Sequence, residues 1–174
     1  NHRIKRATAR AHQAHLWGPR AHDDWSWFLA TGFREDKRAY VHGLRALPRL
    51  GGRGFTSLVY QDGHGESLRF SRFHSKRMAT EDQQPGVWSF EASKGRYVLS
   101  GRVSASLQRM VGAAVTDPEG TERFIHHGGV ADCTLELYKR GLGRKKLERT
   151  LTAKGSVAFQ QGTRMPFEDV AFYV

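Results

Sequence analysis

The chain has 174 residues, of which 39% are hydrophobic and 11% aromatic, enough apolar surface to exclude wholesale disorder and to fill the core of one domain. Its formal net charge is +11, and Arg supplies 20 of the 28 basic residues. This charge is compatible with anionic partners such as nucleic acid, but it does not indicate which fold the chain adopts. The single cysteine, Cys133, excludes an internal disulfide and is expected to serve packing rather than nucleophilic chemistry.

The amino-terminal segment and the lack of targeting signals predict the location of the protein. No stretch approaches the roughly 18 apolar residues of a membrane span, and the start does not resemble a signal peptide. We therefore expect a soluble, cytoplasmic protein in a reducing compartment. Residues 1–12 predict a basic arm, and residues 13–174 predict a single domain. Because the chain opens with Asn1 rather than Met, we expect that a leader, a tag or a whole upstream segment is missing from this sequence.

Apolar residues alternate at a period of two along most of the chain, which predicts strands. Turn formers separate them, including Asp62-Gly63, Lys94-Gly95 and Asp117-Pro118-Glu119-Gly120. No convincing amphipathic helix interrupts the pattern, so we predict an all-β fold, an antiparallel sandwich or closed barrel. In chain order, the expected strands cover about 25–33, 38–46, 55–60, 67–75, 87–91, 96–104, 107–116, 122–126, 131–139, 147–159 and 166–173.

One window, His15–Phe28, concentrates three of the four tryptophans. Trp25 and Trp27 are two residues apart, so on a strand both indoles point to one face, where they fill a core or line an apolar ligand site. The polar neighbours His15 and Arg20 favour the second interpretation, because a few polar groups beside aromatic rings are typical of a binding pocket.

The same window contains candidate acids and metal ligands. A carboxyl group buried against an indole would supply a proton near neutrality, so Asp24 or His15 is the candidate catalytic donor. The alternative is that Asp23, the acid adjacent to Asp24, only turns the chain into the strand that starts at Trp25. His12, His15 and His22 could bind one metal ion, but a zinc site needs further ligands at a recognisable spacing, which only Asp23, Asp24 or the distant pair His126-His127 could supply. We assign no metal and no cofactor.

Two polar residues in a later strand pattern are secondary candidates. Inward-facing His42 and Arg45 would be costly unless they are paired or face a ligand. The predicted ligand-binding set is Trp17, Arg20, Trp25, Trp27, His42 and Arg45.

The run His15-Leu-Trp-Gly-Pro-Arg20 followed by Trp25-Ser-Trp27 resembles the signature that opens the second barrel of a lipocalin-like superfamily. This superfamily includes carotenoid 1,2-hydratases, tocopherol cyclase-like proteins and pericyclase-type fungal cyclases. The resemblance implies a lipocalin-like β-barrel with an apolar cavity, and as partner a second barrel domain or another subunit. This superfamily has an aspartate immediately before the motif histidine, whereas this chain has Ala14 at that position.

Three functions compete. The resemblance implies an enzyme that cyclises or hydrates a terpenoid, polyene or polyketide by acid catalysis, with indole faces stabilising developing positive charge. The residue Ala14 favours a carrier or sensor that binds such a ligand without chemistry. A nucleic-acid or polyanion binder ranks third, because the basic residues are spread out and lack interleaved exposed aromatics. Its candidate contacts are Arg10, Arg20, Arg140, Arg144, Lys145 and Lys146.

Overall fold

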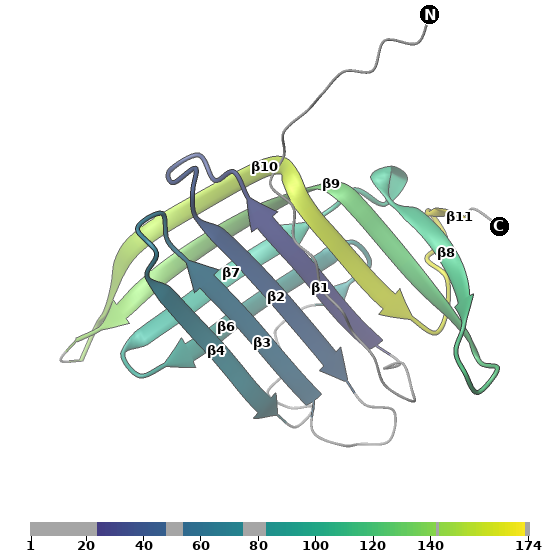
Figure 1. The fold of residues 1–174 in the computed structure, drawn as a ribbon, viewed down its shortest axis with the longest axis horizontal. Helices are drawn as coiled ribbons and strands as arrows, with labels where there is room; N and C mark the ends of the chain where they lie inside the picture. The colour runs from purple at the N-terminus through teal and green to yellow at the C-terminus, as the bar shows by residue number, and fades with distance from the viewer. Residues whose placement is uncertain (1–23, 48–53, 75–82, 142, 173–174) are drawn as a thin grey trace, which may run out of the picture.

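The structure is a computed structural model that describes residues 24–47, 54–74, 83–141 and 143–172. Within these ranges almost every element is a strand, and the strands belong to one sheet with the order β4-β3-β2-β1-β10-β9-β7-β6-β5, while β8 pairs with β9 and β11 with β8 (Figure 1). No described segment forms a helix of the length and apolarity needed to cross a membrane. The strands are β1 Asp24–Thr31, β2 Tyr40–Leu47, β3 Gly54–Gln61, β4 Ser67–His74, β5 Gln83–Gln84, β6 Val87–Lys94, β7 Tyr97–Ser104, β8 Val111–Thr116, β9 Glu122–Arg140, β10 Lys145–Thr163 and β11 Ala171–Phe172.

The sheet curls into a nearly closed antiparallel barrel because of one long hairpin. Strands β9 and β10 each have 19 residues and pair along most of their length. The hairpin pairs with β1 through β10 and with β7 through β9. Register shifts near Val157 bend it, as bulges do, and the bend curves the sheet. Strand β8 pairs with the first part of β9. The result confirms the predicted all-β barrel with little helix.

Most predicted turns are confirmed, and short-range chemistry explains them. Asp117 accepts hydrogen bonds from the backbone N–H groups of Glu119 and Thr121, and Gly120 has a φ of +81°, which glycine adopts at little cost. The turn after Lys94 uses Gly95 at a φ of +56° in the same way. These turns set the register of the strands that they connect.

Three predicted boundaries are wrong. The sequence suggested a break near Gly128-Gly129, but β9 runs through both glycines because neighbouring strands pair with it on either side of them. The predicted final strand, 166–173, shrinks to β11, Ala171–Phe172, which pairs in parallel with β8. The start of the predicted strand 107–116 is a short 3-10 turn, Leu107–Arg109.

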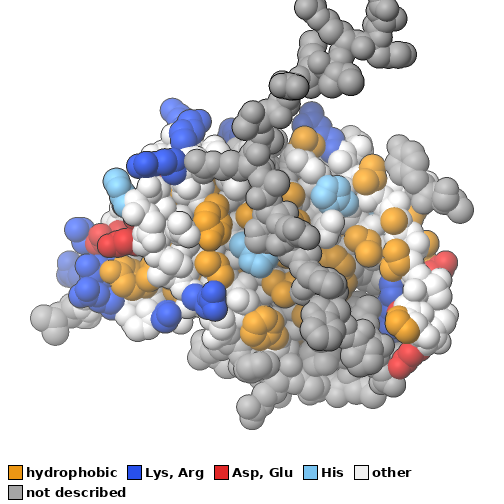
Figure 2. All heavy atoms as spheres, in the orientation of Figure 1, with side chains coloured by type: hydrophobic (Ala, Val, Ile, Leu, Met, Phe, Trp, Pro, Cys, Tyr) orange, Lys and Arg blue, Asp and Glu red, His pale blue; other side chains and the backbone are white. Residues whose placement is uncertain are grey.

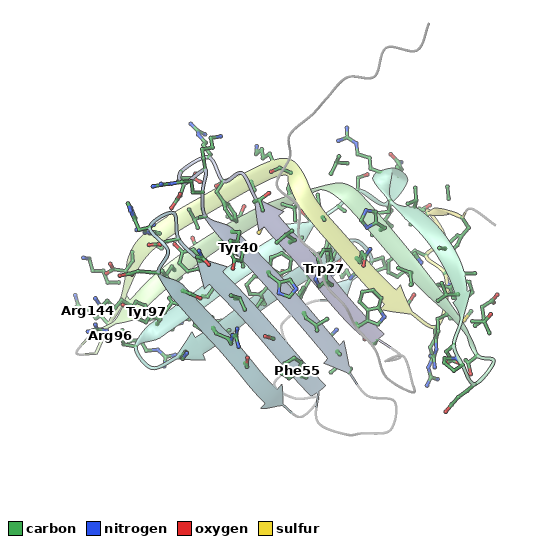
Figure 3. The ribbon with its side chains drawn as sticks, in the orientation of Figure 1. Trp27, Tyr40, Phe55, Arg96, Tyr97 and Arg144 are labelled. Carbon is green, nitrogen blue, oxygen red and sulfur yellow. The ribbon has the colours of Figure 1, made fainter. Side chains whose placement is uncertain are left out.

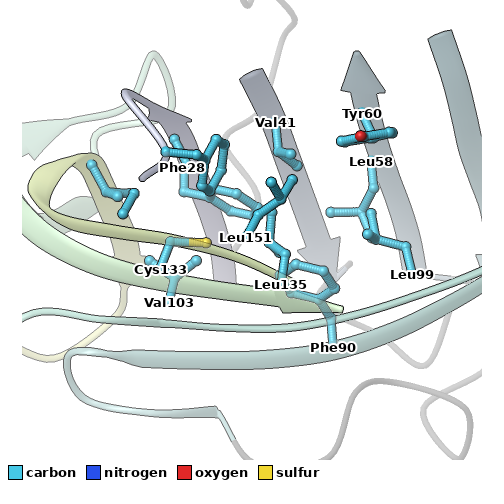
Figure 4. Packing of buried hydrophobic residues seen from close by; sticks show 14 of the residues in the cluster. Phe28, Val41, Leu58, Tyr60, Phe90, Leu99, Val103, Cys133, Leu135 and Leu151 are labelled. Atoms are coloured by element: carbon cyan, nitrogen blue, oxygen red, sulfur yellow. The ribbon is translucent and has the colours of Figure 1, made fainter. Parts of the chain in front are cut away.

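Alternating side chains of opposite walls fill the interior (Figure 4). Phe28 of β1 stacks with Phe90 of β6 at 5.5 Å between ring centroids, and Trp88 meets the Phe28 ring edge-on at 5.3 Å. Glycine makes room for these rings, because a Cβ at Gly43 would lie 2.2 Å from a Phe28 ring carbon. Cys133 is buried in the same core, and burial raises the pKa of its thiol, which confirms its packing role.

Candidate functional site

The alternation of β1 decides which side chains face the barrel interior. Ser26, Phe28 and Ala30 are each 0% exposed and point inward, whereas Trp25 and Trp27 are half-buried on the outer face. The prediction that both indoles share a face is confirmed. The further expectation that they line an interior ligand site is wrong, because Ser26 between them and Phe28 after them occupy the inner positions.

The outer face has its own polar contact. Trp27 Nε1 donates a hydrogen bond to Nε2 of His42 on β2 over 2.7 Å, so His42 carries its ring proton on Nδ1. Trp25 covers Gly162 of β10, where a Cβ would lie 1.9 Å from the indole nitrogen. Figure 3 shows Trp27 with Tyr40 and Phe55 on three neighbouring strands. His42 therefore faces outward and lies beside the tryptophan rather than in the core.

Five buried polar residues form one continuous row across the inner wall, which we call the inner polar row. Each is directly opposite the next in the strand register, on five adjacent strands from β3 to β9. Their exposed fractions are between 0% and 9%, so the row interrupts an otherwise apolar interior. Buried polar side chains in such a position need partners or a ligand. The row consists of Thr56, Arg45, Ser26, Gln161 and His126.

The charged member of the row is Arg45, only 4% exposed. Its Nη1 lies 3.3 Å from Oδ1 of Asp24, whose side chain is 43% exposed at the end of the barrel. Burial lowers the pKa of Arg45, and the carboxylate of Asp24 opposes this shift. The guanidinium stays charged, since even a lowered arginine pKa lies far above neutrality. Two predicted site residues, distant in sequence, thus meet inside the barrel end.

Gln161, on the other side of Ser26 in the row, makes contacts that hold the barrel together. Gln161 Oε1 accepts the backbone N–H of Gly86 over 2.7 Å, and its Nε2 donates to the carbonyls of Gln84 and Val87. Gln161 therefore connects β10 to the turn between β5 and β6. This contact joins two parts of the barrel across a sequence separation of 75 residues.

His126, the last member of the row, contacts the segment that leads to β11. Its Nδ1 lies 3.3 Å from the Gln161 carbonyl, and its Nε2 accepts the backbone N–H of Phe167 over 3.0 Å. The two contacts place the ring proton on Nδ1 and leave Nε2 as an acceptor. Phe167 also stacks on the imidazole at 3.8 Å between centroids. The neutral ring is the form that suits this environment.

We expect His126 to make the stability depend on pH. Burial lowers its pKa in the folded state, so as pH falls the unfolded chain binds the proton first. The contribution is complete above the ordinary pKa of about 6.5 and is lost as the pH falls through and below that value. In urea unfolding from pH 8 to 5, His126→Phe should be less stable by about 1–3 kcal/mol at pH 8 and show a flatter pH dependence.

The matched control is His64→Gln, which alters an exposed histidine. It should retain the pH dependence of the parent chain. Carboxylates such as Asp36 and Asp117 have lowered pKa values because they accept backbone hydrogen bonds, so their effects appear in more acid solution. An unchanged pH slope in His126→Phe between pH 7 and 5 would contradict the role of the histidine.

No family model, curated protein or solved structure matches the chain. The lipocalin-like resemblance, together with the second barrel or subunit that it implies, therefore stays a prediction. Three of its motif residues, His15, Trp17 and Arg20, lie outside the described residues, as do His12 and His22.

A surface depression of about 380 Å³ lies near the β1–β2 turn. Its lining includes Glu35, Asp36 and Arg149. The carboxylates there accept backbone N–H groups: Asp36 from Gly63 over 2.8 Å, and Glu35 from Thr152 over 2.7 Å. These contacts hold turns together. Within the described ranges, no group of three or more His, Cys, Asp or Glu residues is arranged to hold a metal ion.

Sequence reasoning missed three members of the row and the buried indole of Trp88, and it considered His126 only as a distant metal ligand. Ser26, Thr56 and Gln161 are small or neutral residues that carry no motif, and only their strand parity relative to Arg45 could have indicated them. Trp88 was missed because it stands alone in its strand. Its Nε1 is buried and lacks a hydrogen-bond acceptor within the part of the chain that the structure describes.

Proposed function

We propose that this protein binds a hydrophobic small molecule, such as a terpenoid, polyene or polyketide, with the polar head of the ligand at Arg45. The observation that carries the proposal is a guanidinium 4% exposed on the inner wall, directly beside an apolar core. Its desolvation is costly and requires anionic or polar partners. The five N–H donors of its planar fork can hold Asp24 and a ligand oxygen at once.

The surroundings of Arg45 fit a ligand with a polar end and an apolar body. Ser26 and Thr56 flank Arg45 in the row, and their hydroxyl groups can donate or accept hydrogen bonds. Apolar rings, including Phe28 and Trp88, pack together beyond the row, so the apolar body of the ligand enters only when these rings move apart. The buried Trp88 Nε1–H would gain an acceptor from a ligand carbonyl or hydroxyl group.

Retinoic acid and retinol make a suitable probe pair, because they share a polyene body and differ in the head group. We expect the protein to bind both, with the carboxylate preferred, as followed by tryptophan fluorescence. Arg45→Met should weaken retinoic acid binding by about tenfold or more, which corresponds to the loss of one charge-assisted contact. Retinol affinity should change by less than about threefold.

The control is Arg102→Met, which removes an exposed arginine from β7 and should leave both affinities unchanged. Circular dichroism and thermal unfolding establish that each variant is folded. If neither probe binds the parent chain, or if Arg45→Met weakens both probes equally, the assignment of Arg45 as the head-group contact is wrong.

Whether the ligand is transformed is the second part of the proposal. The Oδ1 of Asp24 faces a group that has only donors, so this oxygen accepts a hydrogen bond rather than supplying a proton. This contact favours a carrier over an acid-catalysed cyclase or hydratase. Chromatography of the polyene after incubation distinguishes them, since a carrier returns it unchanged, whereas an enzyme yields a hydrated or cyclised product that Asp24→Asn no longer forms.

A further inference from the structure

Two hairpin tips that are distant in sequence form one basic end of the molecule. Arg140 donates its backbone N–H to the carbonyl of Arg96, and its Nη2 lies 3.2 Å from Ser93 Oγ. Tyr97 is directly opposite Lys139 in the register. Figures 2 and 3 show Lys and Arg side chains gathered at this end. We call it the basic end and define it as Lys94, Arg96, Lys139, Arg140, Arg144, Lys145 and Lys146.

The basic end has an excess of positive charge that its own acids do not cancel. Segments 91–96 and 136–148 contain these seven basic residues and three glutamates. Lys145 pairs with Glu91 at 3.1 Å and Lys146 with Glu148 at 3.8 Å, both on the surface, where ion pairs are weak. Because the side chain of Lys146 is 81% exposed, it is available to an external anion.

The aromatic rings at the basic end do not offer a platform for nucleic-acid bases. Lys139 and Arg96 lie over the Tyr97 ring, each within 5.9 Å of its centroid, and Lys145 lies 5.9 Å from that of Tyr138. The Tyr138 hydroxyl also donates to Glu136 over 2.6 Å. Bases stack on open aromatic faces in single-strand binding, and these faces already carry cations.

An apolar side chain lies among the cations. Leu147 is 47% exposed and directly opposite Tyr138, on the face that also carries Arg140 and Lys145. A polyanion in water would gain nothing from this leucine. A bilayer offers both an anionic surface for the cations and an apolar layer for the leucine.

From this combination we propose that the basic end docks the protein on an anionic phospholipid membrane, with Leu147 entering the interface. The binding is peripheral. Each basic residue near such a surface contributes about fivefold to the partition coefficient, an effect that salt screens. The proposal stands apart from ligand binding in the barrel, because vesicle binding is measured without a ligand.

The test is co-sedimentation with phosphatidylcholine vesicles, with and without about one third phosphatidylserine. We expect binding only to the anionic vesicles, and weaker binding at high salt. The variant Lys94→Gln/Arg144→Gln/Lys146→Gln should bind them about a hundredfold more weakly. The matched control Arg34→Gln/Lys37→Gln/Lys154→Gln removes the same charge at exposed sites elsewhere and should bind within about threefold of the parent.

Leu147→Ser separates a membrane from a polyanion. It should weaken vesicle binding about fivefold and leave binding to a single-stranded oligonucleotide unchanged. The proposal is overturned if anionic and neutral vesicles bind alike, or if the two triple variants lose affinity equally. It is also overturned if Leu147→Ser has no effect on vesicles while the oligonucleotide binds more tightly than they do, which would make the basic end a nucleic-acid surface.

Discussion

Replacing Phe28 by alanine is expected to lower the free energy of unfolding by about 3–5 kcal/mol, the largest effect predicted for a single substitution here. Phe28 is 0% exposed and its ring packs against those of Phe90 and Trp88 on the opposite wall. Its removal leaves a cavity that the barrel walls on both sides cannot close. Urea unfolding followed by circular dichroism measures the loss.

Two variants control for this result. Leu29→Ala changes the next residue of β1, which is half-buried on the outer face, and should cost clearly less. Gly43→Ala should cost about 1–3 kcal/mol by overpacking, because its Cβ would meet the Phe28 ring and Leu58. Phe28→Leu should relieve part of that cost in the double variant. Additive losses would show that the glycine does not make room for the ring.

Substitution of Gln161 by leucine is expected to cost about 2–4 kcal/mol, the second largest effect. The leucine would fill the space but leave the buried Gly86 N–H without its acceptor, and two carbonyls would lose a donor. The connection between β10 and the β5–β6 turn would be lost. Hydrogen exchange should therefore show faster exchange at Gly86 than in the parent.

The neighbouring residue supplies the control. Gln160 faces outward and contacts the His127 ring at 3.0 Å, so Gln160→Leu should cost less than about 1 kcal/mol. Gln161→Glu preserves an acceptor for Gly86 but removes the donor and places a carboxyl group opposite two carbonyls. The free energy of unfolding of Gln161→Glu should be at least as low as that of Gln161→Leu. Equal stability of Gln160→Leu and Gln161→Leu would contradict the role of the buried amide.

Strands and turns could be predicted from the sequence because both depend on nearby residues. A period of two in Cys133, Leu135 and Leu137 matches their burial in β9. The turn at Asp117 follows from side-chain hydrogen bonds within four residues. Prediction failed at Gly128-Gly129, where pairing with strands elsewhere in the chain carries β9 through a locally weak segment.

Face assignment was the main error at the candidate site. Periodicity placed Trp25 and Trp27 together, but it cannot state which of two faces is inside. Size and apolarity suggested that the indoles fill the interior, whereas Phe28 and its partners across the barrel leave no inner position for them. Arg45 was selected correctly as a costly inward charge, while His42, selected for the same reason, faces outward beside Trp27.

The amino-acid sequence by itself determined an all-β chain of short strands, its turns, its basic character and a buried cysteine, since each depends on composition or on contacts within a few residues. Only the tertiary structure decided which faces turn inward and which strands become neighbours. Strand register brings Arg45 beside Ser26 and Gln161 beside His126, and one bent hairpin places Arg96 next to Arg140. These juxtapositions depend on pairings between residues far apart in the chain, which local patterns do not encode.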